Sequence, residues 1–176
     1  MGGLYKRALA RPGNTLKVCC AAMENSHPYS PLSAALTVVI DTQIVMEWLV
    51  FKDAKVAPLV QALEAGSIRW IGSPAMLGEL RHVLWRGIAA KFAPDLPMIE
   101  QAFAQYCQTV EMPALPAVRL VCRDPNDQMF IDLAVTEKVR WLISRDRDVL
   151  ALAKRARAVG LVIVTPEAWA KQQSAP

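Results

Sequence analysis

The sequence is poor in the residues that build most zinc sites and many nucleophilic active sites. It has two histidines, at positions 27 and 82, and four cysteines, at positions 19, 20, 107 and 122, in 176 residues. The cysteines have no zinc-type spacing, and the adjacent pair cannot readily form a disulfide with each other. Isolated cysteines of this kind are typical of a reducing cytoplasm, which is where we expect the protein.

The sequence also lacks a long hydrophobic run. No apolar stretch approaches the roughly 18 residues that cross a membrane, so we expect no membrane association. Residues 1–35 are rich in Gly, Pro, Ser and Asn without a sustained period, which predicts a poorly ordered N-terminal extension. Its basic residues precede an apolar stretch, Val18 to Met23, that is too short for a signal peptide. Met23 is an alternative start, and residues 36–176 form the predicted domain.

Composition indicates an ordinary globular domain. Hydrophobic residues make up 53% of the chain and charged residues 20%, which excludes a disordered protein. The formal net charge is +4. A basic balance permits a polyanionic partner such as a nucleic acid without identifying one.

From residue 36 onward, short β-branched runs alternate with longer helical patterns. The predicted strands cover 36–40, 67–71, 117–121, 140–143 and 161–164, and the predicted helices cover 44–51, 54–65, 74–91, 95–110, a segment from 125, 147–158 and a last one from 166. This alternation predicts an α/β fold with a mainly parallel five-stranded sheet and helices on both faces. In such sheets the site lies outside the carboxyl ends of the strands.

Acidic side chains occur at those positions. Asp41 directly follows the first strand, and Asp146 follows the fourth. Each is also a suitable helix N-cap. Glu79 lies within a helix, at the edge of an apolar stripe formed by Met76, Leu80, Val83 and Leu84. A carboxylate placed there needs a cation or hydrogen-bond donors nearby, because burying it unpaired is costly.

Three further aspartates compete on the next helix. Phe130, Leu133 and Ala134 define its buried face, and on the helical wheel Asp127 points with that face. Asp132 points away and is predicted to be a solvated surface acid. Asp124 precedes proline and is interpreted as the N-cap.

The four inward-facing carboxylates together indicate metal chemistry. Without a cation they would repel one another and raise one another's pKa values. Oxygen ligands favour Mg²⁺ or Mn²⁺ over zinc. Such ions can orient a phosphodiester and activate water, so no histidine is required. His82 lies off the apolar stripe of its helix and is interpreted as a surface residue.

The chain resembles the PIN-domain family, especially its bacterial toxin-like branch. The resemblance covers about residues 36–166 and rests on motifs that occur in the family's order: Val38-Val39-Ile40-Asp41-Thr42, Ser73-Pro74 through Glu79-Leu80, Asp124-Pro125-Asn126-Asp127 with Phe130, and Leu142 through Leu150. The resemblance implies a three-layer PIN-like fold.

The resemblance also implies the ligand set. The family's metal-binding acids correspond here to Asp41, Glu79, Asp127 and Asp146, which are therefore the predicted catalytic and metal-binding residues, with Asp148 as an accessory acid. Thr42 and Ser144 match supporting hydroxyl positions. The family has Asn directly after its Asp-Thr pair, whereas this chain has Gln43. That departure bears on the precision of the metal site and not on the fold.

The function implied by the resemblance is a Mg²⁺- or Mn²⁺-dependent endoribonuclease, the toxin of a toxin–antitoxin pair. A small antitoxin protein and a second copy of the chain, forming a homodimer, are the implied partners beside the RNA substrate. Basic residues such as Arg145 and Arg147 are suitable for phosphate contacts. Exposed tryptophans on the early helices are suitable for a dimer or antitoxin surface.

Two alternatives remain. One is a different acidic α/β enzyme, but Gln43 removes the Asp-x-Asp-x-Thr pattern of a phosphatase, and a phosphoacceptor domain needs adjacent acids after its first strand. The other is a PIN fold without turnover that serves as an RNA-binding or protein-binding module. Metal-dependent cleavage separates this module from the nuclease.

Overall fold

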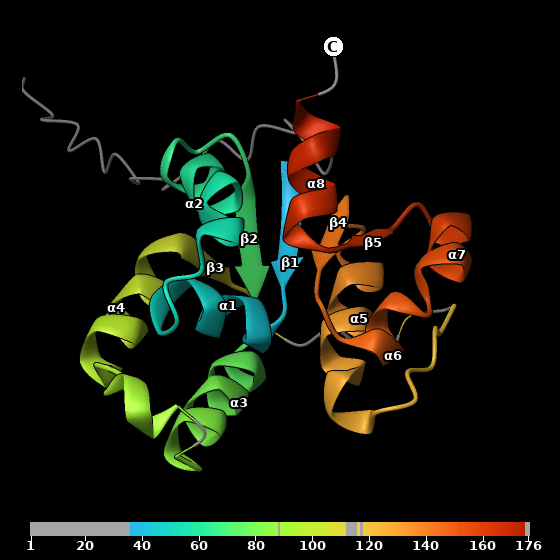
Figure 1. The fold of residues 1–176 in the computed structure, drawn as a ribbon. Coiled ribbons are helices and arrows are strands. Elements are labelled where there is room, and N and C mark those ends of the chain that lie inside the picture. Colours follow the sequence, from blue (N-terminus) through green and yellow to red (C-terminus); the bar gives the residue numbers. More distant parts are fainter. Residues whose placement is uncertain (1–35, 88, 112–115, 117, 175–176) are drawn as a thin grey trace, which may run out of the picture. The chain divides into compact units, whose positions relative to one another are not determined.

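Five parallel strands form a single sheet in the computed structural model, which describes residues 36–174 apart from 88, 112–115 and 117 (Figure 1). The order in the sheet is β3-β2-β1-β4-β5. The strands are β1 (Thr37–Ile40), β2 (Arg69–Gly72), β3 (Cys107–Thr109), β4 (Trp141–Ile143) and β5 (Val162–Val164). The predicted α/β class with a five-stranded parallel sheet is confirmed. The predicted extension, 1–35, lies outside the described residues.

Eight α-helices connect and cover the described strands. They are α1 (Thr42–Leu49), α2 (Ala57–Glu64), α3 (Pro74–Trp85), α4 (Leu96–Tyr106), α5 (Gln128–Thr136), α6 (Arg147–Leu150), α7 (Ala153–Ala156) and α8 (Pro166–Gln173), with 3-10 turns η2 (Ala54–Val56), η3 (Ala90–Phe92), η4 (Pro125–Asp127) and η5 (Arg157–Val159). Helices α3 and α8 each begin with a cap residue followed by proline: Ser73 and Thr165 accept hydrogen bonds from backbone amides of the first turns. None of the described helices has the length and apolar character to cross a membrane.

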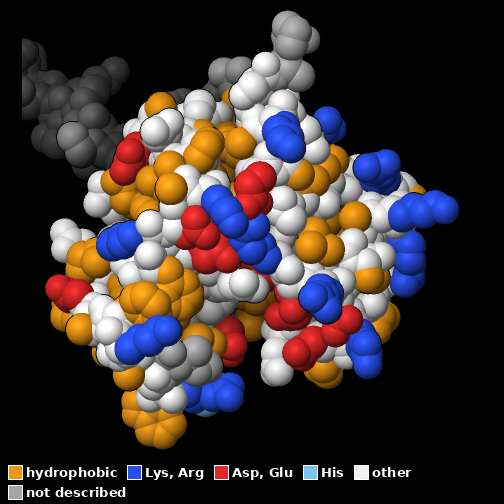
Figure 2. Space-filling model, viewed as in Figure 1, with side chains coloured by type: hydrophobic (Ala, Val, Ile, Leu, Met, Phe, Trp, Pro, Cys, Tyr) orange, Lys and Arg blue, Asp and Glu red, His pale blue; other side chains and the backbone are white. Residues whose placement is uncertain are grey.

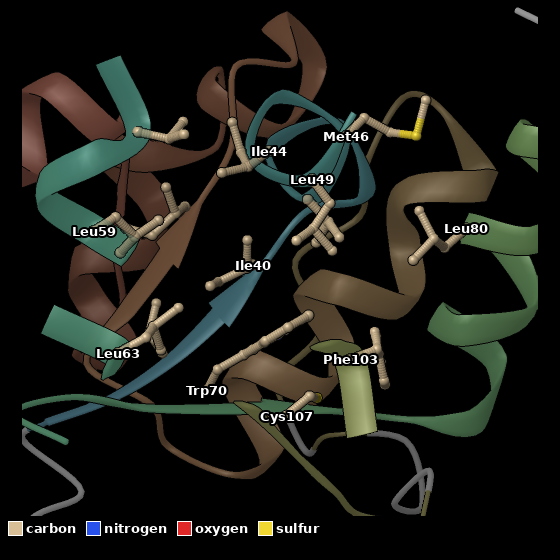
Figure 3. Packing of buried hydrophobic residues seen from close by; sticks show 14 of the residues in the cluster. Ile40, Ile44, Met46, Leu49, Leu59, Leu63, Trp70, Leu80, Phe103 and Cys107 are labelled. Carbon is tan, nitrogen blue, oxygen red and sulfur yellow. The ribbon is translucent and has the colours of Figure 1, made fainter. Parts of the chain in front are cut away.

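Both faces of the sheet are buried, which explains the continuous apolar run of the first strand. Val38 and Ile40 belong to a core with Trp70, whereas Val39 belongs to a second core with Leu142. Figure 3 shows the first core, where Ile40 of β1 lies among side chains of α1, α2 and β2. Helices α1, α2, α4 and α8 contribute to the first core, and α5, α6 and α7 to the second. The fold therefore has three layers.

The third strand differs from the prediction. It is β3, Cys107–Thr109, and not 117–121. Because β3 follows α4 directly and lies at the sheet edge with two exposed residues, it has no apolar run to mark it. Its close pairing with β2 relies on Gly72, where a Cβ atom would lie 2.7 Å from Cys107 Sγ.

The segment predicted as the third strand is held by a side chain instead. Leu120 and Cys122 are buried, while Val118 and Val121 are more than half exposed. The Gln128 side-chain amide accepts a hydrogen bond from Cys122 N at 2.8 Å and donates one to Leu120 O at 2.9 Å. Leu120 and Cys122 therefore hydrogen-bond through their backbone to one glutamine side chain rather than to a neighbouring strand.

Asp132 also differs from the prediction, because it is buried and not solvated. It is 7% exposed, accepts a hydrogen bond from Gln128 Nε2 at 2.7 Å and lies 3.6 Å from the guanidinium of Arg119. The helical wheel placed it opposite the main apolar face correctly, but the segment around Leu120 covers that side of α5. A tertiary contact thus overrides the wheel.

The helix predicted over 147–158 is divided into α6, α7 and η5. Gly160 ends it in the left-handed conformation, with φ of 81°. The helices predicted to reach residues 91 and 110 end at Trp85 and Tyr106.

Strand order reverses at β1, since β2 and β3 lie on one side and β4 and β5 on the other. The carboxyl ends of β1 and β4 are therefore adjacent, in register at Ile40 and Ile143. Figure 1 shows α1, α3, α5 and α6 arranged around these strand ends. This is the position at which ligands bind in open parallel sheets.

Candidate active site

Asp41 stands at the carboxyl end of β1 and is 5% exposed. It caps α1: its Oδ1 accepts a hydrogen bond from Gln43 N at 3.2 Å, and its Oδ2 accepts one from Ser144 Oγ. Burial raises the pKa of Asp41, the two hydrogen bonds oppose that rise, and the carboxylates of Asp146 and Glu47 add to it. The side chain is therefore both a helix cap and a charged group held at some cost.

Ser144 joins the ends of β1 and β4. Its fully buried hydroxyl donates to Asp41 and accepts a hydrogen bond from Asp146 N at 2.9 Å. Asp146 caps α6, with Oδ1 accepting from Asp148 N at 2.7 Å and Val149 N at 3.2 Å. Asp41 and Asp146 are 105 residues apart in the chain, and the Ser144 hydroxyl hydrogen-bonds to both.

Asp127 ends the 3-10 turn that precedes α5. Partial burial and the neighbouring carboxylates, led by Asp41 and Asp146, raise its pKa to about 7. Asp124 caps this turn by accepting a hydrogen bond from Asn126 N at 2.9 Å, as expected from its position before proline. The negative charges of the neighbouring acids thus contribute, after burial, to the raised pKa of Asp127.

All four predicted acids line one cavity of about 240 Å³. Glu79 enters from α3, half-buried, and faces the strand ends that carry Asp41 and Asp146. Figure 2 shows this face of the molecule, where acidic side chains gather on both sides of a hollow near α3, α5 and α6. The lining is completed by Thr42, Gln43, Met46, Phe51, Val83 and Phe130.

The supporting residues differ in their placement. Thr42 lines the cavity, and its buried Oγ1 has no hydrogen-bond partner among the described residues. Asp148 does not line the cavity and instead lies 3.9 Å from the guanidinium of Arg123. His82 is exposed on α3, as expected for a surface residue.

Sequence reasoning missed Glu47 as part of this region. Glu47 is 8% exposed on α1, and its Oε2 accepts a hydrogen bond from Arg145 Nε at 2.8 Å. Arg145 Nη1 also donates to Glu167 of α8 at 2.7 Å. Two nitrogens of Arg145 are therefore paired with carboxylates, and its buried Nη2 has no hydrogen-bond partner among the described residues. The available signal was a glutamate inside an otherwise apolar helix, which needs a partner.

Gln43 points along α1 and not back to Asp41. Its Nε2 donates to Glu47 Oε1 at 3.4 Å, whereas its backbone amide bonds to Asp41. The longer amide thus joins the Glu47–Arg145 pair, and the first aspartate is held by Ser144 and by the backbone.

The donor set fits divalent metal ions. All four cavity acids are oxygen donors of the kind that Mg²⁺ and Mn²⁺ prefer, and a cation would relieve the repulsion that raises the pKa of Asp127. Within the described part of the chain, no three His, Cys, Asp or Glu side chains are grouped tightly enough to form a finished metal site.

A family model for the PIN domain matches residues 37–148, which is more than half of the chain and includes all four acids. The chain belongs to the PIN-domain family. PIN domains are generally nucleases, and they typically act on RNA with divalent metal ions. No curated protein and no solved structure matches the chain closely enough to add a named relative.

Proposed function

We infer that this PIN domain is a Mg²⁺- or Mn²⁺-dependent endoribonuclease whose site is the cavity lined by Asp41, Glu79, Asp127 and Asp146. The observation that carries this inference is that acids from four separate segments line one cavity at the strand-order reversal of the sheet. The nuclease domain in this proposal comprises residues 36–176.

The residues of the chain prepare the reaction by holding charge in fixed positions. Ser144 orients the Asp41 carboxylate and the Asp146 backbone, and Glu79 and Asp127 face them across the cavity. A divalent ion held by these acids would supply the positive charge that orients a phosphodiester and lowers the pKa of the attacking water. The water loses a proton as its oxygen adds to phosphorus, the bond from phosphorus to the leaving ribose oxygen breaks, and that oxygen gains a proton.

The test is cleavage of a mixed cellular RNA pool with Mn²⁺ or Mg²⁺, with EDTA and Asp41→Asn as controls. We expect cleavage that is lost with EDTA and reduced by about 100-fold or more in the variant. Glu64→Gln, an exposed acid on α2 away from the cavity, is the matched control and should cleave normally. A folded wild-type protein that binds RNA but cleaves none with either ion contradicts the proposal and favours the binding module.

We extend the proposal to the toxin of a toxin–antitoxin pair that forms a homodimer and acts in the cytoplasm. One observation supports protein partners, and a second supports the cytoplasmic location. Trp85 at the end of α3 is 82% exposed, and Phe92, Leu96 and Met98 nearby in the chain are also exposed, a set of large hydrophobic side chains unusual on an isolated monomer. The described cysteines, Cys107 and Cys122, are free and buried, as expected in a reducing compartment.

A further inference from the structure

The cavity that holds the acids has a second, apolar side. Four apolar side chains line this side of the cavity: Met46 of α1, Phe51 just after α1, Val83 of α3 and Phe130 of α5. Met46 and Phe130 are almost fully buried, whereas Phe51 and Val83 are half-buried. In Figure 3, Met46 extends from α1 away from the core residues Leu59 and Leu63. Binding metal ions requires the acids but not this apolar side.

The acids and the apolar side chains line the same cavity, so one ligand can contact both. A volume of about 240 Å³ is close to the lower end of small-molecule pockets and leaves space for part of a substrate beside the ions. A ligand with a phosphate beside an apolar group would contact both kinds of lining residue.

We propose that the apolar side of the cavity, with Phe51 as its aromatic member, binds one unpaired nucleobase adjacent to the phosphate that is cut. A nucleotide joins a phosphate to a flat aromatic ring, and so matches the acidic and the apolar sides of the cavity together. This proposal rests on the nuclease function and assigns the contact with the base to Phe51.

Phe51 also contacts a second aromatic ring. The Phe51 and Phe92 rings are 4.9 Å apart between centroids and inclined by 60°. Lys91 Nζ lies 5.0 Å from the centroid of the Phe92 ring, which places a positive charge beside the aromatic pair. Bases stack on fixed aromatic side chains without strong sequence preference, and a neighbouring cation suits the next phosphate of the strand.

Duplex RNA does not fit this arrangement. In an A-form helix the bases are stacked on one another, and the major groove is too narrow for side chains to reach them. A base must therefore be unstacked to contact Phe51 while its phosphate lies near Asp41. The cavity thus selects flexible strands, loops or bulges by shape.

The experiment uses the full chain and a single-stranded RNA with one mapped cleavage position. Each nucleotide near that position is replaced in turn by an abasic residue, and kcat/KM is measured. We expect one position, next to the cut phosphate, at which losing the base lowers kcat/KM by about ten-fold. Phe51→Ala should lower kcat/KM by a similar factor on the intact RNA and should no longer distinguish the abasic strand.

Three variants control this result. Phe51→Trp keeps a flat ring and should retain base dependence, while Phe51→Leu keeps apolar volume and should lose it. Val121→Ala removes an exposed apolar side chain that does not line the cavity and should behave as wild type. Thermal unfolding of each variant shows whether it is folded.

If removing the base lowers kcat/KM by the same factor in wild type and in Phe51→Ala, the proposal is wrong, even if the acids still support cleavage. The apolar side would then be assigned to a peptide partner or to packing alone. If wild type cleaves no RNA, 2-aminopurine placed in the strand still tests the site. Its fluorescence should be quenched by wild type and not by Phe51→Ala, and equal signals contradict base binding.

Discussion

Asp127 has a pKa of about 7, well above its ordinary value of 3.8, because it is partly buried among like charges. The folded metal-free protein therefore keeps a proton that the unfolded chain has already released. The stability that this proton provides is fully present below about pH 4 and is lost as the pH rises through about 7. The raised pKa of the buried Asp41 acts in the same direction.

We predict that the free energy of unfolding in EDTA falls between about pH 5 and about pH 8. Asp127→Asn removes the titrating group, so the variant should show a shallower fall and be more stable than wild type at the higher pH. Denaturant unfolding at both pH values measures this. An unchanged slope in the variant would show that Asp127 does not titrate in this range.

Single residues differ in how far the sequence reveals their surroundings. The positions of Asp41 and Asp146 at strand ends follow from local pattern alone, and the structure places both at the cavity. The pairing of Glu47 with Arg145 joins positions 98 residues apart, so no local period shows it. The prediction for Asp132 was wrong for a different reason: its partners Gln128 and Arg119 are close in the chain, but the helical wheel does not show them.

At the scale of elements, one arginine connects three parts of the fold. Arg145, between β4 and α6, bonds to Glu47 on α1 and to Glu167 on α8, and we call these three residues the arginine strap. The strap fixes the segment that carries Ser144 and Asp146 against the helix that Asp41 caps. Glu47 and Arg145 are mostly buried, so breaking their ion pair should lower the free energy of unfolding more than breaking an exposed pair.

Arg145→Met should lower the free energy of unfolding by about 2 kcal/mol, because two carboxylates lose their partner. Adding Glu47→Gln to this variant should recover part of the loss, since it removes one unpaired charge. Arg81→Met is the matched control: it breaks the exposed Arg81–Glu100 pair and should have little effect. Equal effects of the two arginine substitutions in denaturant unfolding would contradict the strap.

Elements with strong local signals could be predicted, and elements defined by pairing could not. Continuous apolar runs identified β1, β4 and β5, and proline after a cap residue identified the starts of α3 and α8. β3 is short, polar and located at the edge, so only its pairing with β2 defines it. The 118–121 segment is mostly apolar, as a strand would be. Its Leu120 O and the following Cys122 N hydrogen-bond to the Gln128 side chain and not to another strand.

At the scale of the whole molecule, alternating strands and helices were sufficient to predict a parallel sheet, and they indicated its carboxyl edge as the location of a candidate site. They were not sufficient to predict the order β3-β2-β1-β4-β5, which sets which strand ends meet. That order brings β1 and β4 together, and α3 and α5 complete the cavity from either side. The candidate site is therefore a property of the assembled fold and not of any one segment.

The central claim is that Asp41, Glu79, Asp127 and Asp146 act together as one divalent-metal site. The most direct measurement is titration of the full chain with Mn²⁺, followed by electron paramagnetic resonance, in wild type and in four variants that change one acid each to its amide. We expect each variant to bind Mn²⁺ at least about ten-fold more weakly than wild type, and Glu64→Gln to bind it normally. Wild-type protein that binds no Mn²⁺, or four variants that bind it as tightly as wild type, would contradict the account.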